Sequence, residues 1–294
     1  MCLFSVIIPV YNSDKTIRKC LDSVLNQTFG DFEIIVINDG STDDSSDICK
    51  EYALRYTNIR VYDFPNEGVA IARKRGITLA TGEFVIFVDS DDSINTNLLQ
   101  SLADTLIIYP DLDIIRYQAN LINDEPNKNH SRYNFLEKVN YILTGINALK
   151  LWTSPSIKYA VYWLFAFRRK IFSSIHLLPN LNCYEDVAYI PIIIASSNMV
   201  TTIDYYGYNY TCNRNDSLTN TTNIEAKRKH AYDFYNACDF AIRNFIKINN
   251  INTNDIAFFI SDYRRRLNDF FYSMPTDLQT ELSPIYGLPI NTKD

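Results

Sequence analysis

The chain has 294 residues, of which 47% are hydrophobic and 21% are charged, so it can bury a substantial core. Its formal net charge of −6 argues against general affinity for nucleic acid. The six cysteines are scattered without metal-ligand spacing, which favours buried free thiols and a reducing cytoplasm. No signal-peptide pattern starts the chain, and no apolar run approaches the roughly 18 residues that cross a bilayer. We therefore expect a cytoplasmic protein, attached at most to the inner face of the cell membrane.

Apolar runs of strand length alternate with helical patterns over residues 1–118. The runs that predict strands are FSVIIPV (4–10), EIIVIND (33–39), IRVYDF (59–64), EFVIFVD (83–89) and LDIIRYQ (112–118). Between them, apolar residues recur at helical spacing, and a further helix is predicted near 95–109. Strands that are apolar on both faces and separated by helices are typical of parallel sheets covered on both sides. The sequence predicts an α/β fold with a Rossmann-like, mainly parallel sheet flanked by helices. After about residue 120 the alternation ends, and helical patterns from Glu225 onward predict a C-terminal helical extension.

Three polar clusters follow predicted strands: Tyr11-Asn12-Ser13, residues 38–41 and residues 89–92. In open α/β sheets, ligands bind beyond the carboxyl ends of the strands, so we expect these clusters to converge on one crevice. The phosphate-loop pattern is absent, and so is the glycine-rich dinucleotide fingerprint after the first strand. A bound nucleotide would therefore be held by other means.

Asp89 and Asp91, separated by Ser90, stand at the end of an apolar strand, where like charges repel. Two carboxylates in this relation can share one hard cation. Mg²⁺ and Mn²⁺ prefer such oxygen ligands and often complete their shells with substrate phosphates. The alternative is a solvated turn in which Asp92 or Ser93 caps the following helix. The two interpretations are compatible, since Asp92 can cap while the other two carboxylates face the crevice.

Four further residues could take part in binding or catalysis, and each also has a structural alternative. Asp39 can accept hydrogen bonds from a base or ribose, or it belongs to an ordinary Asp-Gly turn. Arg73, on the helix after the third strand, can reach a nucleotide, although the local pattern favours a solvated face. Glu185 and Asp186 begin an apolar helix, where acidic groups are stabilised by the helix dipole. The rival role for this pair is a general base that takes a proton from an incoming hydroxyl.

Taken together, the segments resemble the family 2 glycosyltransferases of GT-A fold. The match is carried by SVIIPVYN and INDGSTDDS, then NEGVAIARKRG, TGEFVIFVDSDD and YEDV, with a looser likeness at 205–219. The resemblance implies an inverting enzyme that takes a sugar from a nucleotide-sugar, most often a UDP-sugar, and uses Mn²⁺ or Mg²⁺. It also implies a glycan or polyprenyl-diphosphate-linked acceptor in the assembly of a bacterial capsule, O-antigen or exopolysaccharide.

The resemblance further implies roles for single residues. Those that would line the nucleotide-sugar site are Pro9, Val10, Tyr11, Asn12, Asp39, Arg73, Asp89 and Ser90. Among them, Asp39 would hydrogen-bond the base, and Asp89 would contact the ribose and the surroundings of the metal. Asp91 would ligate the metal, with Asp89 as a second ligand. Asp186 would be the general base, with Glu185 as the less favoured candidate.

Three parts of the chain are expected on this basis. Residues 1–118 would bind the nucleotide-sugar, 119–222 would bind the acceptor within the same domain, and 223–294 would form the helical region. The last part carries arginines at 264–266 beside aromatic residues at 270–272, which suits a membrane surface, an oligomer contact or helix packing.

Two rival functions remain at this point. The protein could be an inactive glycosyltransferase-like scaffold that binds a nucleotide-sugar. It could also be a sugar-nucleotidyl transferase, but such enzymes usually carry a glycine- and arginine-rich loop after the first strand, which PVYNSDKT does not resemble.

Overall fold

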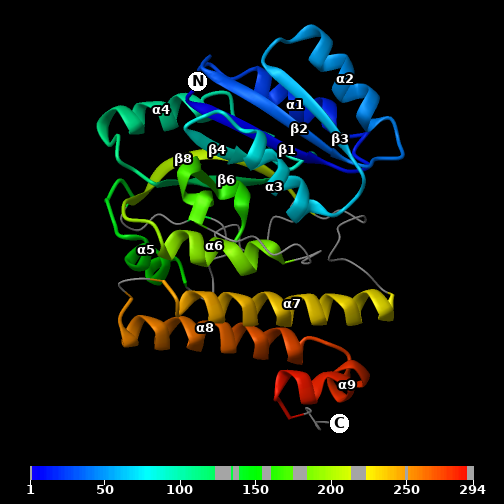
Figure 1. Ribbon diagram of the computed structural model, residues 1–294, viewed down its shortest axis with the longest axis vertical. Coiled ribbons are helices and arrows are strands. Elements are labelled where there is room, and N and C mark those ends of the chain that lie inside the picture. The colour runs from blue at the N-terminus through cyan, green and yellow to red at the C-terminus, as the bar shows by residue number, and fades with distance from the viewer. Residues whose placement is uncertain are drawn as a thin grey trace.

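The computed structural model describes residues 2–122, 134, 139–153, 160–174, 184–212, 223–248 and 251–289. An α/β part contains the N-terminus, and a stack of helices leads to the C-terminus (Figure 1). The strands are β1 (Phe4–Val10), β2 (Phe32–Asp39), β3 (Ile59–Phe64), β4 (Phe84–Phe87), β5 (Ser93–Ile94), β6 (Ile114–Ile122), β7 (Phe165–Arg168) and β8 (Val200–Thr211). The α-helices are α1 (Ile17–Leu25), α2 (Ser45–Arg55), α3 (Val69–Leu79), α4 (Leu98–Ile108), α5 (Gly145–Trp152), α6 (Glu185–Ala195), α7 (Ile224–Phe245), α8 (Thr253–Tyr272) and α9 (Thr276–Tyr286).

The described strands form one sheet in the order β3-β2-β1-β4-β7-β6-β8-β5. As predicted, the first four strands of the chain pair in parallel: β1 lies between β2 and β4, and β3 pairs with β2. The other half of the sheet is mixed. β7 is antiparallel to both β4 and β6, while β6 and β8 are parallel and β5 is antiparallel to β8. The predicted strand at 112–118 therefore exists as part of β6, but β7 separates it from the parallel strands.

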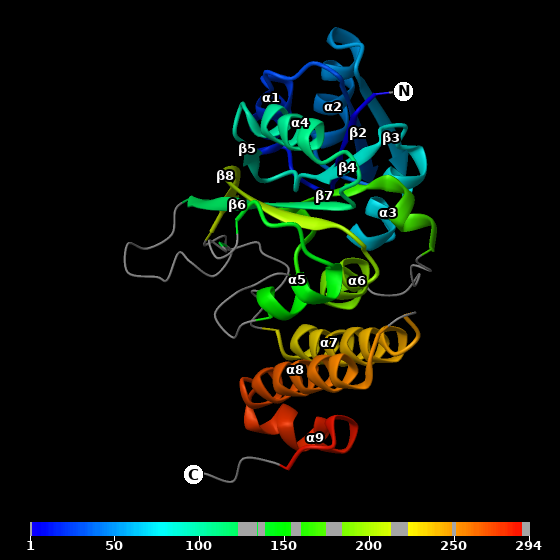
Figure 2. The same ribbon diagram turned by 90° about the vertical axis from the view of Figure 1, so that its left-hand side faces the viewer.

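The parallel strands are covered by helices on both faces of the sheet. Every residue of β1 is buried, as expected for a central strand covered on both faces. Helices α1, α2 and α4 lie on one side of the sheet, and α3, α5 and α6 lie on the other (Figure 2). The buried face of α1 consists of Ile17, Cys20, Leu21 and Val24, which recur at helical spacing. Cys20 is a free thiol, as expected, and so are the other cysteines of the described residues; Cys183 lies outside them.

The C-terminal helices stack on α6 in the order α7, α8 and α9 (Figure 1). Phe270 of α8 stacks on Phe234 of α7 with ring centroids 4.3 Å apart, and Phe271 is buried against α9. Asp262 pairs with Arg265 and Arg266 on its own helix. Helix packing therefore accounts for Phe270 and Phe271, among the three interpretations open for this segment.

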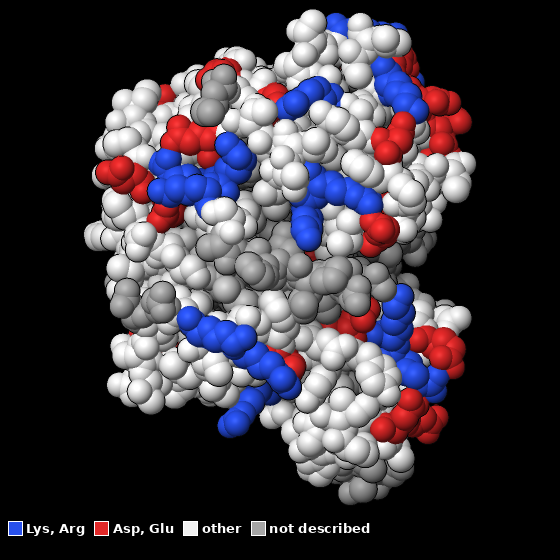
Figure 3. All heavy atoms as spheres, in the orientation of Figure 1, with Lys and Arg blue, Asp and Glu red and all other residues white. Residues whose placement is uncertain are grey.

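Basic and acidic side chains are interspersed on the face shown in Figure 3. Within the described residues, every helix falls short of the length or apolarity needed to cross a bilayer.

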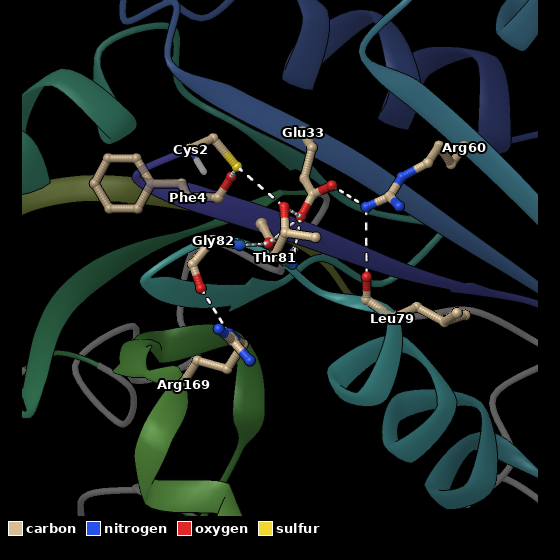
Figure 4. A network of polar contacts seen from close by, with 9 residues as sticks. Cys2, Phe4, Glu33, Arg60, Leu79, Thr81, Gly82 and Arg169 are labelled. Carbon is tan, nitrogen blue, oxygen red and sulfur yellow. Dashed lines mark hydrogen bonds and ion pairs between the residues drawn. The ribbon is translucent and has the colours of Figure 1, made fainter.

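A polar network ties the amino ends of the parallel strands together (Figure 4). Glu33 of β2 accepts hydrogen bonds from Ser5 Oγ (2.6 Å) and from the backbone N–H of Thr81 (2.7 Å), and it pairs with Arg60 of β3. Burial acts to raise the pKa of Glu33, but these hydrogen bonds and the charge of Arg60 outweigh it, so its pKa is lowered. The network joins β1, β2, β3 and the turn before β4, at the end of the sheet opposite to the predicted crevice.

The close packing of α3 on β1 can be tested at Gly76. A Cβ atom added there would lie 2.3 Å from Ile7 Cγ2. We expect Gly76→Ala to lower the free energy of unfolding by about 1–3 kcal/mol, because the overpacking outweighs the higher helix propensity of alanine. Urea unfolding measures this difference. Gly30→Ala is the matched control, since nothing lies within 4 Å of its added Cβ. Equal stability of the two variants would contradict the described contact between α3 and β1.

Candidate functional site

The loops that follow β1, β2 and β4 meet at the carboxyl edge of the parallel strands. Ser13 Oγ and Ser90 Oγ are 2.7 Å apart, which joins the first loop to the third. The backbone N–H of Asn12 donates to Ser41 Oγ (3.0 Å), and the N–H of Thr42 donates to Asn12 Oδ1 (2.8 Å). Asn12 has a left-handed φ of 48°, which asparagine tolerates better than most residues. The three predicted polar clusters therefore do converge.

The four consecutive residues 9–12, which the resemblance assigns to the nucleotide-sugar site, differ in their exposure to solvent. Pro9 and Val10 belong to β1 and are buried in the sheet. Tyr11 is 51% exposed, and Asn12 is exposed beside it. The side chains of Tyr11 and Asn12 are thus accessible to a ligand, whereas those of Pro9 and Val10 are not.

Asp39 connects the end of β2 to the start of α3. Its carboxylate is buried and accepts the backbone N–H groups of Glu67 (3.1 Å) and Gly68 (2.8 Å). Gly40 has a φ of 74°, so the Asp-Gly turn that the sequence left open is present. The Asp39 side chain has a structural role in addition, because it accepts hydrogen bonds from the segment that leads into α3.

Asp89, Asp91 and Asp92 form an acidic cluster after β4. One carboxylate oxygen from each lies within 4.8 Å of the others. Asp92 is buried and accepts hydrogen bonds from Tyr208 Oη (2.8 Å) and from the backbone N–H of Thr211 (2.7 Å). Burial raises the pKa of Asp92 to about 8, and the negative charges of Asp91 and Asp89 add to the effect. Asp92 thus fastens this loop to the end of β8.

The alternative in which Asp92 or Ser93 caps the following helix is wrong. Helix α4 begins at Leu98 with Asn97 as its N-cap residue. Ser93 instead starts the short strand β5, which pairs with β8. Two residues of β5 therefore separate the acidic cluster from the turn that leads into α4.

The chemistry of the cluster fits a hard divalent cation. Its donors are carboxylate oxygens that lie close together, and hard divalent cations prefer such oxygen ligands. Both oxygens of Asp92 already accept hydrogen bonds. The half-buried Asp89 and Asp91 are therefore the residues that would hold such an ion.

Arg73 links the acidic cluster to the start of α6. Its Nη2 donates to Asp89 Oδ1 (2.7 Å), and its Nη1 pairs with the carboxylate of Glu185. The guanidinium also lies 5.0 Å from the centroid of the Tyr162 ring, a cation–π contact. Arg73 is only 9% exposed, so its interpretation as part of a solvated face is wrong. Burial acts to lower its pKa, but the charges of Asp89 and Glu185 outweigh this and raise it.

Glu185 and Asp186 occupy the first turn of α6, although neither is its N-cap residue. That position belongs to Tyr184, whose φ of 63° is left-handed. Glu185 is buried and bound to Arg73, while Asp186 Oδ1 accepts the N–H of Val187 (2.8 Å). Burial raises the pKa of Asp186 to about 7; the charge of Glu185 adds to this shift and that of Arg73 opposes it. The paired Glu185 is thus poorly placed to accept a proton, which leaves Asp186 as the stronger base candidate.

Several residues of the site have no signal that local sequence reasoning recognises. Tyr162 contacts Arg73, and Tyr208 and Thr211 hold Asp92. Tyr208 is itself stacked on Trp163 at 4.6 Å between ring centroids. Tyr208 and Thr211 fall within the segment 205–219, whose loose likeness to the family is the one available hint. Residues 213–219 of that segment lie outside the described residues.

Comparison with known proteins defines the class. The sequence profile described as "Glycosyl transferase family 2" matches residues 5–175, more than half of the chain. The "Uncharacterized glycosyltransferase EpsJ" of Bacillus subtilis (strain 168) is 30% identical over 248 residues, which cover 80% of this chain and 68% of that protein. The chain belongs to glycosyl transferase family 2.

Two further proteins show how far the likeness extends. The "Uncharacterized glycosyltransferase YibD" of Escherichia coli (strain K12) is 37% identical over 168 residues, and the match spans 57% of this chain and 48% of that protein. The crystal structure of S. aureus TarS 1-349 in complex with UDP-GlcNAc has a TM-score of 0.61 at 21% identity, over 97% of this chain and 86% of that one. At this identity the likeness is one of fold, and it confirms the predicted α/β architecture of GT-A type.

The ion pairs of Arg73 make a prediction about stability. Removing one partner of a buried ion pair leaves an uncompensated charge, so Arg73→Met should lower the free energy of unfolding by about 3–5 kcal/mol. Urea unfolding at neutral pH measures this. The control is Arg55→Met, which removes an exposed pair with Glu51 and should leave the unfolding midpoint nearly unchanged. A similar small effect for both variants would show that Arg73 does not neutralise buried carboxylates.

Proposed function

We propose that this glycosyltransferase transfers a sugar from a UDP-sugar to a hydroxyl group of a glycan or lipid-linked glycan, with inversion and with dependence on Mn²⁺ or Mg²⁺. The observation that carries the proposal is the arrangement around Arg73. It places the candidate metal ligand Asp89 on one side of the guanidinium and the helix turn that contains Asp186 on the other. The likeness to TarS, which has been crystallised with UDP-GlcNAc, supports a uridine nucleotide as the donor carrier.

Residues of the loops that follow β1, β2 and β4 would bind the base and ribose. Tyr11 offers an accessible aromatic ring on which a base can stack. Asp39 Oδ1 accepts the N–H of Glu67 and pairs with Arg75 Nη1 (3.4 Å), so Oδ2, which accepts the N–H of Gly68, is the oxygen whose further lone pair would accept a ligand N–H. Ser90, which bonds to Ser13, lies beside the acidic cluster and close to where the ribose would sit under this proposal.

Asp89 and Asp91 would hold the divalent cation. When bound, such a cation acts as a Lewis acid that stabilises the charge developing on the diphosphate leaving group. The chain supplies the preorganisation: Arg73 orients the Asp89 carboxylate, and Asp92 fixes the loop through Tyr208 and Thr211. The metal ligands would therefore be held in position before the donor arrives.

Asp186 would take the proton from the acceptor hydroxyl. A pKa of about 7 is close to the optimum for a general base at neutral pH, because the ionised form is populated and still basic. One base and one displacement give inversion, whereas retaining glycosidases use a second carboxyl group as a nucleophile. Glu185 would remain paired with Arg73 and would not exchange protons with the substrate.

Two rival functions, a sugar-nucleotidyl transferase and an inactive scaffold, are addressed by different observations. Membership of glycosyl transferase family 2 argues against the sugar-nucleotidyl transferase alternative. An inactive scaffold predicts binding of UDP-sugars without release of UDP, which the experiment below detects.

We also propose separate roles for three parts of the chain. Residues 1–118 would bind the donor, and 119–222 would shape the acceptor site. We further propose an acceptor on a polyprenyl-diphosphate carrier in bacterial surface polysaccharide assembly, and peripheral membrane contact through 223–294. Because Phe270 and Phe271 are used in helix packing, that contact would rely on other side chains of the C-terminal region.

Release of UDP from UDP-glucose, UDP-galactose, UDP-GlcNAc and UDP-GalNAc tests the function. We expect one of these donors to release UDP with Mn²⁺ and not with excess chelator. Asp91→Ala should reduce release by about 10²-fold or more, and Asp186→Asn by about 10²–10⁴-fold, because each removes a group that acts on the transition state. Asp104→Ala, an exposed aspartate on α4, is the control and should behave as wild type. Binding of all four donors without release by the wild type would favour the scaffold.

The pH dependence of release tests the base separately. Below the pKa of Asp186, about 7, the carboxyl group is protonated and cannot accept a proton. We therefore expect kcat/KM to fall about tenfold for each pH unit below 7 and to level off above it. Rates measured from about pH 5 to about pH 9 would show this fall in kcat/KM. The residual rate of Asp186→Asn should not fall below pH 7 in this way. If it does, the base is another group.

A further inference from the structure

Helix α6, which begins with the proposed base, contains a proline at position 191. Proline has no backbone N–H, and in an α-helix the N–H of residue 191 would bond to the carbonyl of residue 187. The Val187 carbonyl, one residue after Asp186, therefore has no partner at the usual helical position. Val187 is buried, where a carbonyl without a hydrogen bond is unfavourable.

A side chain from the C-terminal layer supplies the missing donor. The hydroxyl group of Tyr263, on α8, donates to the Val187 carbonyl across 76 residues of sequence. Tyr263 is fully buried, and its ring packs against Phe259 with centroids 4.4 Å apart. Phe259 in turn stacks on Phe245 of α7 at 3.7 Å. The hydroxyl is thus held by a packed aromatic column that spans two helices.

The residue on the other side of the acidic pair is held by the same layer. Tyr184 adopts a left-handed backbone conformation, which a bulky residue retains only when its surroundings hold it. Its ring packs edge-on against Phe234 of α7 (5.1 Å) and Phe270 of α8 (5.9 Å). Contacts from α7 and α8 therefore hold the chain immediately before Glu185 and immediately after Asp186.

We propose that Tyr263 is a positioning residue for glycosyl transfer: by replacing the hydrogen bond that Pro191 omits, it holds the first turn of α6 and so the carboxylate of Asp186. The inference rests on the proposed role of Asp186 as the base. It gives the C-terminal helices a function in the reaction, although none of them contributes a residue to the described acidic cluster.

Tyr263→Phe tests the proposal, because it removes only the hydroxyl oxygen. With the UDP-sugar panel and Mn²⁺, we expect kcat for UDP release to fall about tenfold or more, since a small displacement of a catalytic group is costly. KM for the donor and the affinity for UDP should stay within about twofold, because the proposed donor-binding residues lie on other elements. The control is Tyr286→Phe, which removes a hydroxyl bond to the Ala231 carbonyl (2.8 Å) between α9 and α7. This variant should keep the wild-type kcat.

Pro191→Ala provides the rescue. Alanine restores the N–H that can bond to the Val187 carbonyl within the helix, so Tyr263→Phe should lower kcat far less in this background. The double variant also covers the case in which Tyr263→Phe alone unfolds. An equal loss of kcat in both backgrounds would overturn the proposal, and so would a loss no larger than that of Tyr286→Phe.

Asp186→Asn, measured in parallel, separates this proposal from the one it rests on. Wild-type release by Asp186→Asn would remove the base assignment itself. An inactive Asp186→Asn together with an unaffected Tyr263→Phe would overturn only the positioning role.

Discussion

The buried ion pairs of Arg73 hold the two halves of the site together. A guanidinium between two carboxylates lowers the cost of removing all three charges from water, and its fork of donors fixes their relative positions. Through Asp89 it touches the loop that follows β4, and through Glu185 it touches the first turn of α6. These elements come from distant parts of the chain, and Arg73 links the loop that contains the candidate metal ligands to the helix turn that contains the candidate base.

The carboxyl groups of the site have different surroundings, and these surroundings suit them to different roles. Asp92 is buried and hydrogen-bonded, and it fastens a loop. Asp89 and Asp91 are half-buried and close enough to share a cation. Glu185 is paired with Arg73, and burial raises the pKa of both Glu185 and its neighbour Asp186, that of Asp186 to about 7, which suits a base. Divergent environments of this kind are how active sites separate metal binding, structure and proton transfer.

The C-terminal helices α7 and α8 contact the turn of α6 that contains Glu185 and Asp186. Helix α6 carries the acidic pair at its start and a proline one turn and a half later, so its first turn is less self-sufficient than that of an ordinary helix. The layer formed by α7 and α8 compensates through Tyr263 and through the rings around Tyr184. Side chains of α7 and α8 therefore contact the residues on both sides of the acidic pair.

The sequence by itself determined the features that depend on neighbouring residues. Apolar periodicity located the parallel strands to within a few residues, and the family motifs pointed to the carboxylates after β4 and at the start of α6. Only the tertiary structure decided that β7 enters the sheet beside β4, that Asp92 binds β8 rather than capping α4, and that Arg73 is buried. Each of these depends on a partner far away in the chain; Arg73 and Glu185, for example, are 112 residues apart. Local patterns report which face of an element is apolar, but the identity of the group packed against that face is set by the fold as a whole.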